Sequence, residues 1–372
     1  MKLLSLPRPI IIILFISAFS LFLFIANLVV YEAIAGIFGI TKDGNLLILG
    51  SVLFVLSGSF ILASIVGMRY YNWFTRWFYR FSAIWIGLFT YLFFAAFLYG
   101  LVLMVPFLPA SSIGKLLVAG ALLVSTYGIL HNRMIRISKI EVALPNLPEV
   151  WKGRKAIWIS DVHLGQLYGS SHVQKIVDTV NALPHDIIFI GGDLYDGTGA
   201  SDIRELVAPL KGFTGKLGTY FITGNHEEIG DSSAFVSAVR SANIRPLLDE
   251  MVEIDGLQII GVDYRNTANW EDLQNILERL SLQKDKPSIL LKHEPKNIAI
   301  AHDAGISFQI SGHTHQAQMW PLGYIANFVY KGFGYGLHKH ESMFVYTSSG
   351  VGTWGPPMRV GTDSEIVHIT FI

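Results

Sequence analysis

Long apolar stretches fill the first third of the chain. Four of them have no Asp, Lys or Arg in their interiors, at residues 9–35, 45–68, 81–107 and 113–130. Each holds about 18–27 residues, enough for a helix that crosses a hydrocarbon core about 30 Å thick. They show no polar face of the kind that a soluble helical bundle needs. The pattern therefore predicts an N-terminal bundle of four transmembrane helices. The first stretch is too long for a signal-peptide core, so we expect it to stay as an anchor.

Strand-length apolar runs and helical patterns alternate through the rest of the chain. The runs that read as strands and precede polar motifs are 157–160, 187–190, 220–223, 288–292 and 308–311. Other strand patterns are 136–144, 251–254, 257–262, 343–348 and 366–372. Helical patterns occupy 171–183, 201–210, 232–242 and 269–280. This order predicts an α/β (α+β) fold, in which one mixed sheet or two packed sheets carry helices on the outside.

Composition divides the chain at the same place. The chain is 51% hydrophobic, too apolar for an ordinary soluble protein, yet nearly all of its acidic residues follow residue 131. We expect a membrane domain at 1–131, a connector at 132–150 and a catalytic domain at 151–372. The net charge is zero, which argues against a nucleic-acid partner. The chain has no cysteine, which excludes disulfides and thiolate metal sites.

Basic residues near the ends of the apolar stretches predict the orientation in the membrane. One side carries Lys2, Arg8, Arg69, Arg76, Arg80, Arg133, Arg136 and Lys139. The other side carries only Lys42 and Lys115. Because basic residues favour the cytoplasmic side, we expect both termini and the catalytic domain to be cytoplasmic.

Metal-ligating residue types follow five of the predicted strands. They are Asp161, His163, Asp193, Asn225, His293, His313 and His315. Ligands collected at the carboxyl ends of strands are how open α/β sheets build sites. Strand alternation puts His313 and His315 on one side, about 6.6 Å apart at Cα. That spacing suits two ions about 3.5–4 Å apart better than one. Nitrogen and oxygen ligands favour Mn²⁺, with Fe or Zn²⁺ as alternatives, over Ca²⁺.

The chain from about residue 150 onward resembles the calcineurin-like metallophosphoesterases. The family pattern is D-x-H, G-D-x-x-D, G-N-H-[DE], H and G-H-x-H. It occurs here, in order, from Asp161-Val162-His163 to Gly312-His313-Thr314-His315. The ending from Ser348 to Arg359 is similar to the membrane-associated bacterial branch, although that branch has two glycines where this chain has Gln316-Ala317. The resemblance implies a four-layer αββα sandwich and a bacterial inner-membrane location.

The resemblance also implies a role for each ligand residue. Asp161, His163 and His315 would hold one metal ion. Asn225, His293 and His313 would hold the other, and Asp193 would bridge them. Two cations acidify a shared water to hydroxide and stabilise its in-line attack on phosphorus. His226 would be the general acid, and Asp196 would orient it.

The sequence allows more than one role for several other polar residues. Arg359 could bind a substrate phosphate, because its planar head group matches that geometry, or it could be a surface arginine. His338 and His340 read as a solvated loop, with a substrate loop or an extra ion site as alternatives. Glu227 and Glu294 follow ligand residues, where they either support the ligands or lie exposed.

Three functions fit these observations. The leading one is a membrane-anchored phosphoesterase that uses two divalent metal ions to hydrolyse a phosphoester or pyrophosphate. Its partners would be the lipid bilayer and a phosphorylated substrate, and the anchoring alone favours a substrate that is lipid-linked. The second is a tethered nucleotide phosphodiesterase or nuclease, which a basic groove would support. The third is a non-catalytic membrane scaffold with an inherited fold, which the loss of a ligand residue would support.

Aromatic residues and glycines alternate after the His-x-His motif. Residues 319–337 include Trp320, Tyr324, Phe328 and Phe333, and four glycines. Such spacing predicts a mobile loop more than a regular helix. The loop either overhangs the metals and touches the bilayer, or completes the core of the domain.

The basic-residue pattern gives a prediction about topology. Single cysteines placed in the loops near Lys42 and Pro109 should react with a membrane-impermeant maleimide in intact cells. Cysteines within 150–372 should react only after the cells are opened. Labelling of the catalytic domain from outside would reverse the predicted orientation.

Overall fold

The computed structural model describes residues 8–197, 203–229, 231–267 and 270–372, and within these ranges the side chains from residue 17 onward except that of Trp270. The chain separates into two compact units. The first contains Met1–Ile65 and Phe78–Tyr127, and the second contains Val66–Trp77 and Gly128–Ile372. The loop between the second and third apolar helices therefore belongs to the unit that carries the phosphoesterase-like motifs.

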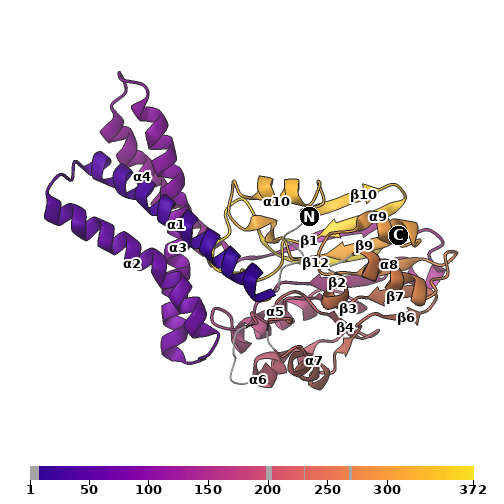
Figure 1. Cartoon of the computed structure of the whole chain (residues 1–372). Helices are drawn as coiled ribbons and strands as arrows, with labels where there is room; N and C mark the ends of the chain where they lie inside the picture. Colours follow the sequence, from indigo (N-terminus) through magenta and orange to yellow (C-terminus); the bar gives the residue numbers. More distant parts are fainter. Residues whose placement is uncertain (1–7, 198–202, 230, 268–269) are drawn as a thin grey trace. The chain divides into compact units, whose positions relative to one another are not determined.

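Within the described residues, four helices are long and apolar enough to cross a membrane (Figure 1). They are α1 Arg8–Phe38, α2 Asp43–Gly67, α3 Trp73–Leu103 and α4 Ala110–His131. The prediction of four helices is confirmed, but α3 begins earlier than expected and includes Arg76 and Arg80. Reciprocal hydrogen bonds explain this start, because Thr75 N donates to Asn72 Oδ1 and Asn72 N donates to Thr75 Oγ1, both at 3.0 Å.

The described strands of the second unit form two six-stranded sheets. The first has the order β1-β12-β2-β3-β4-β5, with bounds Ile135–Val142, Ser364–Phe371, Lys155–Ile159, Ile187–Gly191, Thr219–Ile222 and Arg245–Pro246. The second has the order β10-β11-β9-β8-β7-β6, with bounds Gly336–His340, Met343–Thr347, Phe308–Ser311, Ser288–Leu291, Leu257–Gly261 and Glu250–Ile254. Neighbours β2 to β5 are parallel, as are β7, β8, β9 and β11. Each sheet is therefore mixed, because β12 is antiparallel to β2 in the first sheet, and β10–β11 and β6–β7 are antiparallel pairs in the second.

Alternating side chains on the strands build three apolar layers. Trp158 and Phe189 of the first sheet pack with Phe308 of the second in the central layer. The opposite face of the first sheet packs against α5 Ser170–Asn181, α6 Ile203–Val207 and α7 Ser232–Ser241. The outer face of the second sheet packs against α8 Trp270–Arg279 and α9 Ile298–Asp303. The predicted αββα sandwich is confirmed, because successive strand residues point to opposite layers.

Several short elements were not foreseen from the sequence. They are α9, β5, β10, the helix α10 Gly323–Val329, and the 3-10 turns Glu149–Trp151, Ala208–Gly212, Tyr264–Asn266 and His315–Ala317. Positions 201–202 of the predicted helix 201–210 lie outside the described residues. The expected loop 319–337 thus contains one short helix, and a strand begins at Gly336.

Gln166 joins the α2–α3 loop to the rest of the motif-bearing unit by hydrogen bonds. Its fully buried side-chain amide donates to Gly67 O at 3.0 Å and to Tyr70 O at 2.9 Å. Arg76 Nε donates in turn to Gln166 O at 3.4 Å. Gln166 follows His163 by three positions, so the loop contacts the segment that carries two of the expected ligands.

This contact gives a prediction about stability. Gln166→Ala leaves two carbonyl oxygens without their donor, which costs roughly 1–3 kcal/mol for buried polar groups. We expect a lower Tm for the purified full chain and faster proteolysis of the α2–α3 loop. Gln174→Ala, an exposed glutamine on α5, is the matched control and should behave as wild type. An unchanged Tm for Gln166→Ala would show that the loop does not depend on this amide.

Candidate metal centre

The expected ligands come together at the carboxyl ends of both sheets. Asp161 and His163 follow β2, Asp193 follows β3, and His293 follows β8. Asn225 follows β4, and His313 and His315 follow β9. Five of these residues have positive φ: Asp161, His163, Asp193, His313 and His315. Such backbone conformations are costly for non-glycine residues and gather at functional sites.

One cluster contains Asp161, His163 and His315, whose ligand atoms lie within 4.8 Å of one another. His163 Nε2 and His315 Nε2 face each other at 2.9 Å. His315 Nε2 lies 3.6 Å from Asp161 Oδ1. Asp161 is fully buried, and its carboxylate also accepts from His313 N at 2.9 Å. Two imidazoles and a carboxylate thus converge in a site almost closed to solvent.

A second cluster contains Asp193, His293 and His313. His293 Nε2 lies 3.2 Å from Asp193 Oδ2, and His313 Nδ1 lies 2.8 Å from Asn225 Oδ1. Asp193 Oδ2 is also 3.9 Å from His163 Nε2 in the first cluster. One carboxylate oxygen therefore lies within reach of both clusters.

The surroundings of His293 require a positive charge beside Asp193. Its Nδ1 lies 2.7 Å from the carbonyl of Gly191 and donates to it. On a neutral ring the lone pair would then be on buried Nε2, 3.2 Å from the carboxylate oxygen Asp193 Oδ2. Two such acceptors repel each other unless a positive charge lies between them, supplied either by a proton on Nε2 or by a metal ion. Without a metal ion the proton is favoured, because burial is outweighed by the Asp193 charge, which raises the pKa of His293 to about 10. Nitrogen and oxygen donors of this kind suit first-row divalent ions.

His226 and Asp196 lie beside the first cluster. His226 Nδ1 is 3.2 Å from the Asp196 carbonyl and 3.7 Å from its Oδ1. Asp196 Oδ1 is also 3.6 Å from His163 Nδ1, so the same groups form a third candidate ligand set, His163, Asp196 and His226. Burial opposes the charge on His226, but the Asp193 and Asp196 carboxylates raise its pKa above the ordinary value. The geometry thus favours a protonated imidazole next to the ligands.

Arg359 does not have the environment expected of a substrate-binding residue. Its side chain is fully buried. Nη1 donates to His315 O at 2.9 Å, and Nη2 donates to Ser349 O at 2.7 Å and Gly352 O at 2.6 Å. Burial lowers the pKa of Arg359 to about 10. The guanidinium ties the ligand loop of His315 to the C-terminal segment, so the geometry favours a structural role over phosphate binding.

His338 and His340 lie on β10, away from both clusters. His338 Nε2 is 2.7 Å from Tyr335 O, and the His340 ring packs 5.6 Å from that of His302. Neither belongs to a group of potential ligands among the described residues. The predicted solvated loop is therefore a strand, and nothing in its surroundings supports an extra ion site.

Glu227 holds the backbone around Asp193, a member of the second cluster, through hydrogen bonds. It is fully buried and accepts three backbone hydrogen bonds, from Asp193 N at 2.9 Å, Tyr195 N at 3.1 Å and Gly224 N at 2.6 Å. Burial and the nearby Asp193 charge raise the pKa of Glu227 to about 7. Glu294 accepts from Lys296 Nζ at 2.6 Å and lies 3.6 Å from His313 Nε2. Glu227 and Glu294 are therefore buried residues that hold the expected ligands, and neither is simply exposed.

The C-terminal segment holds Asp161 in place. Gly352 N donates to Asp161 O at 2.9 Å, and Val351 N donates to Ser160 O at 3.0 Å. Gly350 has φ +76°, and a Cβ there would lie 2.6 Å from the Asp161 Cβ. Only glycine meets both conditions. Buried Glu365 anchors this segment by accepting from Ser349 N at 3.0 Å, a contact between distant residues that no sequence motif indicates.

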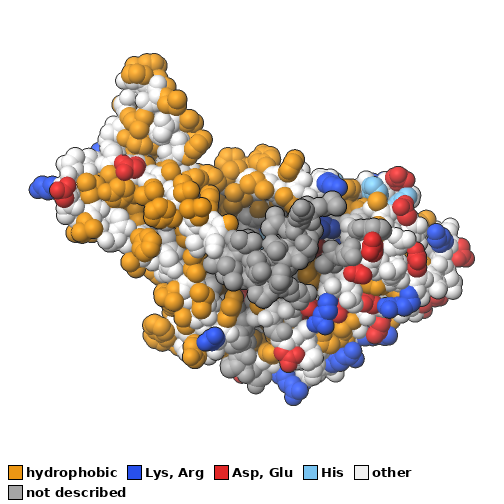
Figure 2. Space-filling view, viewed as in Figure 1, with side chains coloured by type: hydrophobic (Ala, Val, Ile, Leu, Met, Phe, Trp, Pro, Cys, Tyr) orange, Lys and Arg blue, Asp and Glu red, His pale blue; other side chains and the backbone are white. Residues whose placement is uncertain are grey.

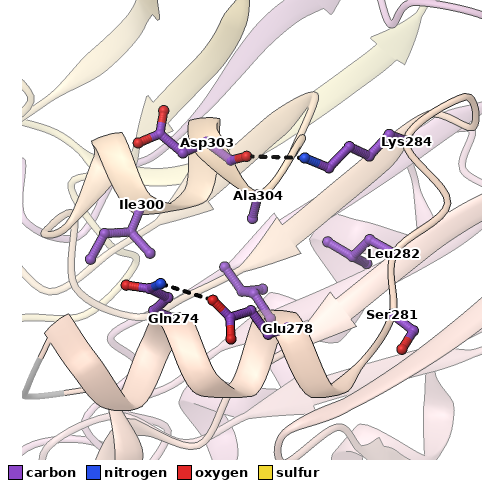
Figure 3. A pocket seen from close by; sticks show the side chains of 9 residues that line it. Gln274, Glu278, Ser281, Leu282, Lys284, Ile300, Asp303 and Ala304 are labelled. Atoms are coloured by element: carbon purple, nitrogen blue, oxygen red, sulfur yellow. Dashed lines mark hydrogen bonds between the residues drawn. The ribbon is translucent and has the colours of Figure 1, made fainter.

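A pocket of about 370 Å³ lies elsewhere, between α8 and α9 (Figure 3). Gln274 donates to Glu278 across one turn of α8, and Lys284 Nζ donates to Asp303 O at 3.4 Å. The pocket contains none of the expected site residues. The expected ligand clusters therefore lie outside this cavity.

Comparisons with known proteins agree with this geometry. The family model described as calcineurin-like phosphoesterase matches residues 155–317, which include all seven expected ligands. An uncharacterized metallophosphoesterase of Aquifex aeolicus is 30% identical over 265 residues, which cover 67% of this chain and 97% of that protein. The chain belongs to the calcineurin-like phosphoesterase family.

Longer relatives add a membrane context. A transmembrane protein with metallophosphoesterase domain from Bos taurus is 36% identical over 63% of this chain. An uncharacterized metallophosphoesterase of Helicobacter pylori is 32% identical over 61% of this chain. The matched region spans 56% and 62% of these two relatives. A solved NAD nucleotidase of Haemophilus influenzae is 17% identical, with a TM-score of 0.35 over 53% of this chain and 45% of that one, too low a similarity to bear on activity.

The role of Glu227 gives a prediction about stability. In Glu227→Gln, an NH₂ group replaces one oxygen that faces backbone N–H groups, so buried donors lose their acceptor, at a cost of roughly 1–3 kcal/mol. We expect a lower Tm and fewer metal ions per purified chain. Glu228→Gln removes only a partly exposed pair with Arg265, worth about 1 kcal/mol or less, and is the matched control. Equal Tm values for the two variants would contradict a supporting role for Glu227.

Proposed function

We propose that the protein is a membrane-anchored phosphoesterase that uses two divalent metal ions. The observation that carries the proposal is the position of Asp193, whose Oδ2 lies 3.2 Å from His293 Nε2 and 3.9 Å from His163 Nε2. Each of these imidazoles belongs to a different ligand cluster. A single buried carboxylate between two clusters suits a pair of ions in the range of about 3.5–4 Å.

The ligands divide between two ion positions. Asp161, His163 and His315 would hold the first ion, and Asn225, His293 and His313 the second, with Asp193 shared. Two bound ions would acidify a water molecule and stabilise the negative charge that develops on the phosphoryl group. Mn²⁺ is the ion that we propose, with Fe or Zn²⁺ as alternatives for this nitrogen and oxygen set.

His226 supplies the proton that the leaving group needs. Its Nδ1 is directed to the Asp196 carbonyl, which fixes the ring and leaves Nε2 for proton transfer. The bond between phosphorus and the leaving oxygen breaks as that oxygen takes the Nε2 proton. The nearby Asp193 and Asp196 carboxylates raise the pKa of His226 above its ordinary value, which favours the protonated imidazole. Asp196 therefore acts on His226 and not on the substrate.

The membrane anchor bears on the substrate. Four of the described helices are long and apolar enough to cross a membrane, and the Bos taurus relative is named as a transmembrane protein. We infer a cytoplasmic catalytic domain from the basic residues that flank the helices, and a bacterial inner membrane from the resemblance to the bacterial branch of the family. An enzyme held at the bilayer has ready access to lipid-linked phosphoesters or pyrophosphates. The zero net charge disfavours a nucleic-acid substrate.

Two substitutions test this mechanism. Asp193→Asn removes the shared charge, so the purified full chain should lose both its metal and its hydrolysis of p-nitrophenyl phosphate with Mn²⁺. His226→Ala removes only the proton donor, so turnover should fall about 10²–10⁴-fold while the metal content holds. His302→Ala, a histidine remote from the clusters, is the matched control. Wild-type rates in both Asp193→Asn and His226→Ala would refute the proposed mechanism.

A further inference from the structure

The short helix α10 presents apolar side chains to solvent. None of its residues is buried. Phe328 is 85% exposed and Tyr324 is 72% exposed. With their exposed neighbours they form a surface that we call the α10 patch: Trp320, Tyr324, Ile325, Phe328 and Val329. Figure 2 shows hydrophobic side chains gathered where Figure 1 labels α10. Exposed apolar patches of this kind mark interaction sites.

The structure separates two aromatic residues that the sequence placed in one segment. Phe333 packs against the core beside the outer face of the second sheet. Phe328 lies outside that core, and nearly all of its side chain is accessible. The segment is therefore part core and part exposed surface, and only its exposed part needs an explanation beyond folding.

Contacts inside the second unit place the patch beside the end of an apolar helix. Arg359 N donates to Gly128 O in the last turn of α4 at 3.0 Å. A Cβ on Gly128 would lie 2.7 Å from Val360 Cγ2. Val360 O in turn accepts from Trp320 N at 2.8 Å. Because α4 is long and apolar enough to cross a membrane, its last turn is where the chain would leave the bilayer, and that turn contacts this region.

The patch is also continuous with the metal centre. Tyr330 follows the last residue of α10, donates from its hydroxyl to Glu294 at 3.2 Å and packs 6.1 Å from the ring of His313. Thr314 Oγ1 donates to Gly334 O at 2.7 Å and holds the following turn against the His-x-His motif. On another side, half-exposed Trp354 lies 6.0 Å from the ring of His226. Apolar side chains thus border the ligand clusters on two sides.

We propose that the α10 patch rests in the interface of the bilayer and that the metal centre takes a phosphoester whose other part is embedded there. The substrate class is a lipid phosphate, an inference that rests on the proposed phosphoesterase function. The oxygen of water would bond to phosphorus, and the bond from phosphorus to the lipid oxygen would break. The lipid oxygen would take the proton that His226 donates. The phosphate reaches the ligands while the acyl chains remain among lipids.

The chemistry of the patch favours lipid over a protein partner. Tyr324 and Trp320 combine apolar bodies with polar tips, which suits the level of lipid head groups. Exposed Lys331 follows the helix and suits anionic lipid. Five side chains fall well short of the roughly 20–30 residues per side in a stable protein interface. Contact with a bilayer next to α4 needs no interface of that size, because the apolar helices of the same chain already hold the patch near the bilayer.

The absence of native cysteine allows a direct test of contact with lipid. The full chain carrying Phe328→Cys would be labelled with an environment-sensitive fluorophore and placed in nanodiscs that contain nitroxide-labelled lipid. The matched control is Gln274→Cys, an exposed position on α8 beside the pocket of Figure 3. We expect strong quenching at position 328 and little at position 274.

The other occupants of the patch would give different results. Equal, weak quenching at both positions would overturn the contact with lipid. Energy transfer between labels on two chains at position 328, without lipid quenching, would show that a second copy covers the patch and would also overturn the proposal. Because quenching needs no catalysis, these results hold even if the protein hydrolyses nothing.

The lipid substrate is tested with Phe328→Ser, for which Asn327→Ser on the same helix is the matched control. The probes are phosphatidate in phosphatidylethanolamine nanodiscs and soluble p-nitrophenyl phosphate, both with Mn²⁺. Burial of one aromatic side chain corresponds to about a tenfold effect or more, so we expect Phe328→Ser to raise KM for phosphatidate about tenfold. Hydrolysis of the soluble ester and the Tm should remain unchanged in both variants.

Two outcomes would separate this inference from the proposed function. If wild-type protein cleaves p-nitrophenyl phosphate, but phosphatidate is neither cleaved nor competes, the lipid substrate is overturned and the phosphoesterase stands. If wild-type protein cleaves neither ester, the proposed function falls, and the quenching alone decides whether the patch meets the bilayer. Equal loss of both activities with a lower Tm in Phe328→Ser would show that Phe328 belongs to the core.

Discussion

The buried carboxylate of Asp193 is the constraint on which the site depends. Its side chain is almost fully buried, and it lies next to imidazoles from both sheets. Burial alone would raise its pKa, but the positive charge available on His293 and His226 holds the pKa of Asp193 well below its ordinary value. A buried anion of this kind persists only when positive charge compensates it. The imidazoles of the ligand clusters and the position of His226 meet that requirement.

The same requirement explains why two sheets are needed. Asp161, His163 and Asp193 come from the first sheet, whereas His293, His313 and His315 come from the second. The central apolar layer between Trp158, Phe189 and Phe308 fixes the distance between the sheets and hence between the ligands. Loops with positive φ at five ligand positions then turn the side chains inward. The packing of the core thereby sets the geometry of the metal centre.

Sequence patterns were sufficient for the apolar helices and for the strands that precede the expected ligands, although the short strands β5 and β10 were missed. Each ligand immediately follows an apolar run, and hydrophobic periodicity is a local signal that survives without a structure. Arg359 and Gln166 show what such patterns miss. The guanidinium of Arg359 lies among carbonyl groups from separate loops, and the amide of Gln166 donates to carbonyl groups 99 and 96 residues earlier in the chain. Partners that are distant in sequence leave no periodic signal. The start of α3 at Trp73 was missed for a different reason, because the residues that cap the helix, Asn72 and Thr75, precede the apolar run.

The central claim is that two ions share Asp193. Its most direct test is the metal content of the purified full chain, loaded with Mn²⁺, freed of excess metal and measured by inductively coupled plasma mass spectrometry against amino-acid analysis. The account predicts two ions per chain for wild type. Because the exposed acids of the protein bind metal weakly, ions that survive extensive dialysis report the buried clusters. A stoichiometry of one or fewer in fully folded protein would contradict a shared site and would leave Asp193 as the ligand of a single ion.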